Sequence, residues 1–351
     1  MTSKQSNLWG NEATKFFFEL SPDLVLKTVD QLGFKTTGRV MAMNSMENRV
    51  YEVEIESESN HPSDHSKIIK FYRPGRWSKD QIQDEHDFLF DLSEFELPVI
   101  APLLFDEQSL FSLPEENLFY TLFPKQGGRA PDEFTPDEIE QVGRLIARLH
   151  NVGSLKNASH RLSLNPEIYL KSNLDYLIGQ KIIPAHYELS YKTALESIYK
   201  LCHDSFKNVT NIRLHGDCHL GNILRREETF HLIDFDDMVM GPSIQDLWLL
   251  LPGRDEYAEA LRGHLLQGYG SLRDFNYEEL RLTEILRTLR MINYSAWISK
   301  RYDDPAFKQA FPFFESPNYW EGQVNDLREQ IYHIESQAHS FSHSLYRPDY
   351  D

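Results

Sequence analysis

The sequence predicts an α+β protein with two lobes, a small β-rich N-terminal lobe and a larger, mainly helical C-terminal lobe. The chain has 351 residues, more than the roughly 250–300 at which a single hydrophobic core stops growing. Segments with alternating apolar residues dominate before Pro124, and segments with helical spacing dominate after Arg129. A pair of glycines lies between them. We therefore place an N-terminal lobe at residues 1–124 and a C-terminal lobe at residues 125–351.

The N-terminal lobe begins with one helix and continues as strands. Ser21, Pro22 and Asp23 supply an N-cap, a proline at the first helical position and an early acid, which predict a helix over residues 22–32. Apolar and polar residues then alternate with a period of about two, which is typical of half-buried strands. Strands are predicted at residues 39–43, 49–55, 67–72, 99–105 and 118–123, giving a sheet of about five strands.

One helix is inserted into this sheet. Ser78 and Gln81 form a capping box, which predicts a helix from Lys79 to about Leu92. Glu85 lies on the apolar stripe of this helix, three residues after Ile82. A buried carboxylate needs a cationic partner, since otherwise its pKa rises until it is neutral.

The C-terminal lobe is predicted to be helical apart from one short hairpin at residues 214–237. Thr135 and Glu138 form a capping box with Pro136 at the first helical position, which predicts a helix ending near His150. Further helices are predicted at residues 170–178, 185–205, 243–251, 255–270, 277–302 and 317–340.

Composition excludes several classes of protein. Lys and Arg number 36 against 54 Asp and Glu, so the net charge of −18 argues against a general nucleic-acid binder. Two cysteines cannot make a disulfide framework, and no signal-peptide pattern is present, so we expect a cytoplasmic protein. The apolar runs are far shorter than the roughly 20 residues of a membrane span. Our expectation is a monomer that binds neither membrane nor nucleic acid.

Polar residues gather in the predicted hairpin. Residues 214–224 read Leu-His-Gly-Asp-Cys-His-Leu-Gly-Asn-Ile-Leu, and residues 230–237 read Phe-His-Leu-Ile-Asp-Phe-Asp-Asp. A hairpin would carry Asp217, Asn222 and Asp234 to one end. The amide of Asn222 and the carboxylate of Asp234 suit Mg²⁺, which completes its shell with phosphate and water. Asp217 would then be free to orient or deprotonate a hydroxyl, as phosphoryl transfer requires.

The motif His-Gly-Asp-x-His-x-Gly-Asn, followed by Ile-Asp-Phe-Asp, resembles the aminoglycoside phosphotransferase and choline kinase superfamily. The resemblance implies a protein kinase-like fold that binds ATP and Mg²⁺ between its two lobes. It also implies that Asp217 is the catalytic base, that Asn222 binds the metal, and that Asp234 is a metal ligand of the catalytic set.

The N-terminal lobe agrees with this resemblance. A kinase places a strand lysine on the α- and β-phosphates and holds it with a helix glutamate, and Lys70 and Glu85 match these two positions. The usual glycine-rich phosphate loop is missing, and residues 44–49 read Asn-Ser-Met-Glu-Asn-Arg instead. Backbone amides, the Ser45 hydroxyl and Asn48 are the expected nucleotide contacts there.

Four segments resemble the bacterial stress response kinase A group of Ser/Thr protein kinases: Asn-Ser-x-Glu-Asn-Arg-Val-Tyr at 44–51, Lys-Phe-Tyr-Arg-Pro at 70–74, Arg-Trp at 76–77 and Leu-His-Gly-Asp-Cys-His at 214–219. This implies a protein Ser/Thr hydroxyl as the acceptor. A kinase for a small molecule of the choline, homoserine or aminoglycoside type is the alternative, because only twelve positions separate Asp234 from Asp246 and leave no long activation segment. A non-enzymatic nucleotide-binding regulator is the third hypothesis.

Several neighbours of the motif have two interpretations. His215, Cys218 and His219 could bind zinc, but we favour a structural role for the histidines within the loop. Cys218 is either a redox-sensitive thiol or a buried one. Asp236 and Asp237 either bind a second metal or are exposed acids of a turn.

Asp246 is expected to tie the catalytic loop to the helix that follows it.

Two features of the C-terminal lobe are left open. The predicted helix near 281–301 carries five cations and one acid, Glu284. Its arginines either pair with acids of the core or form an acceptor-binding face. The aromatic segment 311–320 is either a buried lid or the floor of the acceptor cleft.

Overall fold

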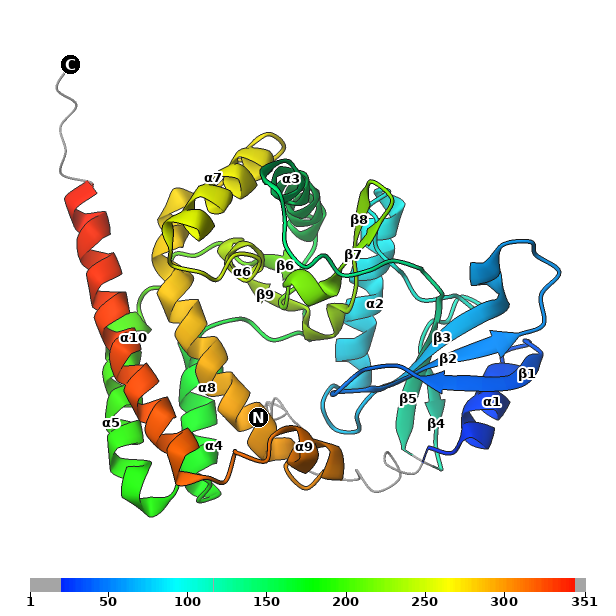
Figure 1. The fold of residues 1–351 in the computed structure, drawn as a ribbon, viewed down its shortest axis with the longest axis horizontal. Coiled ribbons are helices and arrows are strands. Elements are labelled where there is room, and N and C mark those ends of the chain that lie inside the picture. Colours follow the sequence, from blue (N-terminus) through cyan, green and yellow to red (C-terminus); the bar gives the residue numbers. More distant parts are fainter. Residues whose placement is uncertain (1–19, 116, 345–351) are drawn as a thin grey trace.

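The computed structural model describes residues 20–115 and 117–344, and within these residues it has a sheet at the N-terminal end followed by a mainly helical body (Figure 1). The sheet is antiparallel, with the strand order β1-β2-β3-β5-β4. Its strands are β1 (Thr36–Ala42), β2 (Arg49–Ile55), β3 (Ser66–Phe71), β4 (Phe111–Leu113) and β5 (Leu118–Pro124). The predicted α+β class is therefore confirmed.

One strand of the sequence prediction is wrong. Residues 99–105 make only isolated bridges, Val99 with Leu232 and Phe105 with Gln108, and the fifth strand is β4 instead. The physical reason is that the segment contains Pro102 and follows Pro98, and proline has no N–H to donate to a strand ladder. The segment still follows the sheet, since the Leu103 N–H donates to the carbonyl of Leu122.

Two helices flank the sheet. The first, α1 (Pro22–Asp30), is capped by the Ser21 hydroxyl and packs Val25 and Val29 into the same apolar cluster as Val53 of β2. The second, α2 (Lys79–Glu94), has the predicted capping box and lies between the sheet and the helical body (Figure 1). Its Phe88 belongs to the hydrophobic core of the helical body, so α2 links the two parts.

The helical body contains the predicted helices, with changes at their ends. Residues 170–178 are a short π-helical turn (Glu167–Lys171) followed by α4, and residues 277–302 are a 3-10 segment (Tyr277–Leu282) followed by α8. The helices are α3 (Pro136–Gly153), α4 (Ser172–Gly179), α5 (Ala185–Cys202), α6 (Ile244–Trp248), α7 (Glu256–Gly270), α8 (Thr283–Arg301), α9 (Pro305–Ala310) and α10 (Pro317–Ser344). None of the helices described is long and apolar enough to cross a bilayer.

In place of the single predicted hairpin, the structure has two pairs of antiparallel strands. A hairpin of β7 (Ile223–Arg226) and β8 (Thr229–Leu232) is flanked by β6 (Ile212–Leu214), which pairs with β9 (Val239–Gly241). The two connections between these pairs, residues 215–222 and 233–238, therefore leave the strands close together. The lobe boundary after residue 124 stays a prediction, although β5 ends at that residue.

Close packing of α3 against α7 depends on a glycine. A Cβ atom placed on Gly143 would overlap the backbone oxygen of Leu265, so only glycine lets the two helices approach this closely. Replacing Gly143 with alanine should lower the free energy of unfolding by about 1–3 kcal/mol, because overpacking forces the helices apart. Chemical denaturation would measure this loss.

The matched control lies on α7 itself. A Cβ atom on Gly263 would meet no atom within 4 Å, so Gly263→Ala should leave stability unchanged or raise it by about 0.5–1 kcal/mol. Equal effects of the two substitutions would contradict the close helix contact at Gly143.

Candidate active site

A buried carboxylate holds the first of the two connections in place. Asp246 of α6 accepts hydrogen bonds from the backbone N–H groups of His215 and Gly216, both at 2.8 Å. This is the anchoring role that the sequence analysis expected. Gly216 has φ +86°, and a Cβ atom there would overlap the backbone oxygen of Asp237, so the two connections touch at this point.

The two histidines of the motif have separate structural roles. His215 is fully buried, and its Nε2 lies 2.8 Å from the carbonyl oxygen of Ile233, which ties the first connection to the second. His219 accepts a hydrogen bond from the Gly221 N–H through Nδ1, at 3.0 Å. No group of three or more His, Cys, Asp and Glu side chains in the described part of the chain is arranged to hold a metal.

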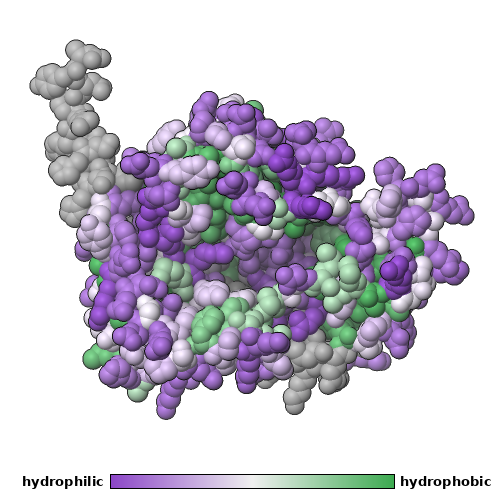
Figure 2. All heavy atoms as spheres, in the orientation of Figure 1, coloured by the Kyte–Doolittle hydropathy of each residue, from purple (hydrophilic) through white to green (hydrophobic). Residues whose placement is uncertain are grey.

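A cavity of about 720 Å³ lies between the sheet and the helical body, and Figure 2 shows a hollow on this face. Six of the residues singled out in the sequence line it: Ser45, Asn48, Lys70, Glu85, Asp217 and Asp234. Asn222, the remaining residue predicted for the site, is not part of the cavity lining, and its Nδ2 donates to the carbonyl oxygen of Asp217 at 2.9 Å. This hydrogen bond holds the side-chain amide of Asn222 in one orientation. It uses Nδ2, so Oδ1 is the other polar atom of the same amide group.

Asp217 is held by two basic side chains. The Arg290 guanidinium lies 2.5 Å from its Oδ1, and Nε2 of His219 lies 3.4 Å from its Oδ2. Burial alone would raise the pKa of Asp217, but the hydrogen bond from His219 and the charge of Arg290 hold it well below its usual range. The carboxylate is therefore ionised at neutral pH and can accept a hydrogen bond from a hydroxyl group.

Asp234 has an unusual backbone conformation. Its φ of 61° and ψ of 69° lie in the left-handed region, which residues other than glycine occupy rarely and at a cost in energy. The side chain is 56% exposed, and its Oδ1 lies 3.7 Å from the Lys70 ammonium. The strained turn thus places a solvent-accessible carboxylate at the cavity wall.

Lys70 of β3 is a buried cation surrounded by carboxylates. Its Nζ lies 3.4 Å from Oε1 of Glu85 on α2 and 3.0 Å from Oδ1 of Asp236. Burial lowers the pKa of Lys70, but the charges of Asp236 and Glu85 outweigh this and raise it well above its usual range. The pair of Lys70 and Glu85 that the sequence suggested is therefore present as an ion pair.

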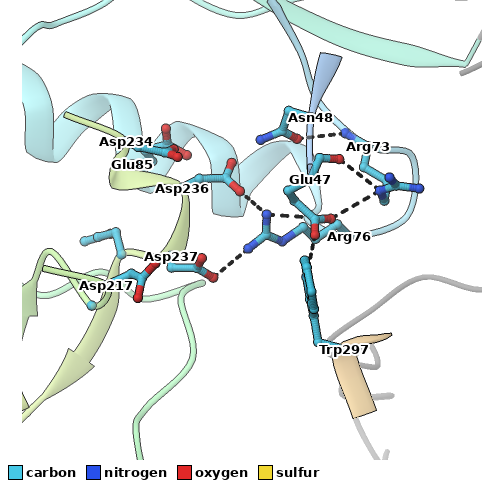
Figure 3. Close-up of polar contacts among 12 residues, drawn as sticks. Glu47, Asn48, Arg73, Arg76, Glu85, Asp217, Asp234, Asp236, Asp237 and Trp297 are labelled. Carbon is cyan, nitrogen blue, oxygen red and sulfur yellow. Dashed lines mark hydrogen bonds and ion pairs between the residues drawn. The ribbon is translucent and has the colours of Figure 1, made fainter. Parts of the chain in front are cut away.

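Two arginines with no role predicted from the sequence also contact the carboxylates around Lys70. Arg161 is buried and lies 2.9 Å from Oε2 of Glu85, while also donating to the carbonyl oxygen of Asp236 at 2.7 Å. Arg76 pairs with Asp236 and lies 2.6 Å from Asp237 (Figure 3). Asp236 is buried, so the interpretation as an exposed turn acid is wrong for this residue. Burial raises the pKa of Glu85, and its two cations oppose that shift.

The loop between β1 and β2 is cross-linked by polar contacts. The Ser45 hydroxyl accepts from the Asn48 N–H at 3.3 Å, and Asn48 Oδ1 accepts from the Arg73 N–H at 3.1 Å. Arg73 also donates to the carbonyl oxygen of Glu47 at 2.9 Å. These bonds fix the loop without the glycines of the usual phosphate loop.

Glu47 ties this loop to α8 (Figure 3). Its carboxylate accepts from Nε1 of Trp297 at 2.7 Å and from Nη2 of Arg301 at 2.6 Å. Burial would raise the pKa of Glu47, but the charges of Arg301 and Arg76 lower it to about 2. The only sequence signal for Glu47 was its place in the segment at 44–51. Its partners come from the distant helix α8 and from Arg73 and Arg76, which follow β3.

Cys218 is buried within the connection of residues 215–222. Burial raises the pKa of its thiol well above the usual value, so the reactive thiolate is scarce at neutral pH. This argues against a redox-sensitive cysteine. We expect Cys218 to resist alkylation by iodoacetamide in the native protein at pH 8 and to react on unfolding, as peptide mass spectrometry would show. Rapid labelling of Cys218 in the folded protein would contradict this.

The comparisons with known proteins agree on one family. A family model described as the phosphotransferase enzyme family matches residues 42–283. Stress response kinase A of Escherichia coli is 33% identical over 321 residues, which are 91% of this chain and 95% of that protein. Serine/threonine protein kinase RdoA of Salmonella typhimurium matches at the same 33% identity over 321 residues, again 91% of this chain and 95% of that protein.

The fold is similar to that of solved kinases. The structure of amicoumacin kinase hAmiN in complex with AMP-PNP, Ca²⁺ and Ami has a TM-score of 0.71 and 19% identity, covering 91% of this chain and 96% of that chain. The sequence expectations of a kinase-like fold and of an enzyme are thereby confirmed, and the alternative of a non-enzymatic regulator is set aside. The chain belongs to the phosphotransferase enzyme family, and within it to the stress response kinase A group, and is a kinase that transfers a phosphoryl group to a hydroxyl.

Proposed function

We propose that the protein transfers the γ-phosphate of ATP to a Ser or Thr hydroxyl of a protein substrate in the bacterial stress response. The observation that carries the transfer step is the cavity, which brings the carboxylates of Asp217 and Asp234 and the Lys70 ammonium to one place. Phosphoryl transfer depends on such positioning and charge neutralisation around the reacting groups. The protein acceptor and the stress response are proposed from the names of the relatives, serine/threonine protein kinase RdoA and stress response kinase A. We further propose that it acts in the cytoplasm. We also propose that it acts as a monomer, since Asp217, Asp234 and Lys70 all lie on one chain.

Residues 1–124 would form the nucleotide-binding lobe. Lys70, held by Glu85, would contact the α- and β-phosphates, and the loop with Ser45 and Asn48 would cover the phosphates. The adenine base would lie against apolar residues of the cavity lining. Candidates for this contact are Val50, Ile68, Ile100, Phe123, Leu224 and Ile233.

Residues 125–351 would form the catalytic and acceptor-binding lobe. Asp217 would accept the proton of the acceptor hydroxyl as its oxygen forms a bond to the γ-phosphorus. The bond between the γ-phosphorus and the bridging oxygen breaks, and ADP leaves with that electron pair. Arg290 and His219 keep the Asp217 carboxylate ionised for this role.

The residues present fit a magnesium ion. Mg²⁺ prefers oxygen ligands and usually binds through one or two protein groups and substrate phosphates. Asp234 offers a 56% exposed carboxylate, and Asn222 offers the amide oxygen opposite its bonded Nδ2. These two residues would hold the ion, which when bound supplies charge neutralisation for the phosphates.

A small-molecule alcohol is the second candidate acceptor. The observation that favours it is the contact between Glu47 and α8, which joins two parts of the cavity wall, Glu47 and Trp297. A cavity of about 720 Å³ is large enough for a nucleotide and a small alcohol.

Radiolabel transfer from γ-labelled ATP separates the two candidates. The protein would be incubated with Mg²⁺ and either a generic protein substrate or a panel of choline, homoserine and aminoglycosides. We expect label on Ser or Thr of protein. Label found on the small molecules alone would overturn the protein-kinase proposal and support the second candidate.

A further inference from the structure

One face of α8 forms a wall of the cavity beside Asp217. The residues that line it recur at three- and four-residue spacing, so they share one side of the helix. They are Leu286, Leu289, Arg290, Asn293, Tyr294 and Trp297. Because Asp217 would accept the proton of the acceptor, the acceptor hydroxyl must come within hydrogen-bond distance of Asp217 and therefore lie close to this face.

The carboxylates near this face already have cationic partners. Glu47 is bound by Arg301 at 2.6 Å, and Asp237 by Arg76 at 2.6 Å. The ring of Trp297 also faces the guanidinium of Arg301, with 5.6 Å between the ring centre and the guanidinium carbon. An ammonium group on an acceptor would therefore have to displace an arginine from each of these positions.

Arg290 is the cation that remains accessible on this wall. Its side chain is 46% exposed, and the contact described for it is a single one, from Nη1 to Oδ1 of Asp217 at 2.5 Å. A guanidinium carries five N–H donors in a planar fork, which matches a carboxylate or a phosphate group. The ion pair with Asp217 thus uses only part of its capacity.

We propose that Arg290 is a specificity-determining residue, and that it selects an acceptor whose hydroxyl lies beside a carboxylate or phosphate group. The inference rests on the proposed function, because it takes Asp217 as the base. An anionic group next to the hydroxyl gains the free donors of Arg290, whereas an ammonium group in the same position meets a like charge. A Ser or Thr with an acidic neighbour in a peptide and a small hydroxy acid share this chemistry.

The test uses two pairs of acceptors, and the members of each pair differ in the sign of one charged group. The first pair is a serine peptide with glutamate or with lysine beside the serine, and the second is 3-hydroxypropionate and 3-amino-1-propanol. We expect kcat/KM to favour the acidic member of a pair by about tenfold or more. Calorimetric binding of the same compounds, with Mg²⁺ and a non-hydrolysable ATP analogue, gives the preference without turnover.

Variants of Arg290 supply the decisive comparison. Arg290→Glu should reverse the preference, and Arg290→Lys should keep its direction at a lower ratio. The ratio within a pair is the readout, because either variant also changes the contact with Asp217 and hence the absolute rate. Arg281→Glu is the matched charge reversal: Arg281 is exposed and lies outside the cavity lining, so the preference should stay that of the wild type.

Three outcomes would overturn the proposal. They are a wild-type preference for the cationic members, a preference that Arg290→Glu leaves unchanged, and a change confined to the KM for ATP, which would assign Arg290 to the nucleotide. The same measurements also distinguish failure of the protein-acceptor proposal from failure of the role assigned to Arg290. If 3-hydroxypropionate is phosphorylated and neither peptide is, the protein-acceptor proposal fails while the assignment of Arg290 stands.

Discussion

Replacing Asp217 with asparagine should slow phosphoryl transfer by roughly 10²–10⁴, the contribution that a general base typically makes. Asparagine keeps the size of the side chain but cannot accept the acceptor proton. The partner Arg290 is half-exposed, so water can solvate its guanidinium and the fold should persist. Single-turnover transfer of γ-labelled phosphate in the presence of Mg²⁺ is the direct measurement.

Two controls accompany the Asp217 variant. Circular dichroism and thermal unfolding should be close to those of the wild type, which shows that the loss of rate is chemical. Asp326→Asn, an exposed substitution of the same type on α10, should leave the rate unchanged. Full transfer activity in Asp217→Asn would show that Asp217 is not the base.

Glu85→Gln should lower the free energy of unfolding by about 3–5 kcal/mol, because it leaves the charges of Lys70 and Arg161 buried with one partner fewer. The same change should raise the KM for ATP, since Lys70 loses the group that positions it. Urea denaturation measures the first effect, and steady-state kinetics in ATP measure the second.

A partly exposed ion pair within one helix is the matched control for Glu85. Glu140 lies 2.5 Å from Arg144 on the surface of α3, four residues away, so Glu140→Gln should cost no more than about 0.5 kcal/mol. Should Glu85→Gln fail to fold, Glu85→Asp keeps the charge on a shorter side chain and should give a smaller loss in the same direction. A cost for Glu85→Gln as small as that of the Glu140 control would disprove the buried network.

Local sequence determined most of the secondary structure. The capping boxes at Ser78 and Thr135 are present in the structure, because a cap involves only residues three positions apart. The prediction of a strand at 99–105 was wrong because it used only the alternation of apolar and polar residues. That alternation carries no information about the N–H groups that prolines lack. The short strand β4 was missed, since its three residues are too few to show a period.

The sequence identified the motif residues because their spacing is local. It did not identify the residues that they contact from distant parts of the chain. Asp217, Asn222 and Asp234 lie within 18 positions of one another, and one hairpin region brings them together. Arg161 lies 76 positions from Glu85, to which it binds. Arg290 lies 73 positions from Asp217, and the helix that carries it had two interpretations between which the sequence could not decide.

The sequence by itself determined the α+β class, most helices and strands, and the family through the motif at 215–222. These properties depend on periodicity, capping and short spacings, which the chain carries locally. Apart from the pair of Lys70 and Glu85, only the tertiary structure decided which cations neutralise the acids at the cavity, because α2, α8 and the loop at 44–48 meet there from distant parts of the chain. Coulomb energy depends on distance in space, so the pairing of Arg290 with Asp217 and of Arg301 with Glu47 could emerge only from the fold.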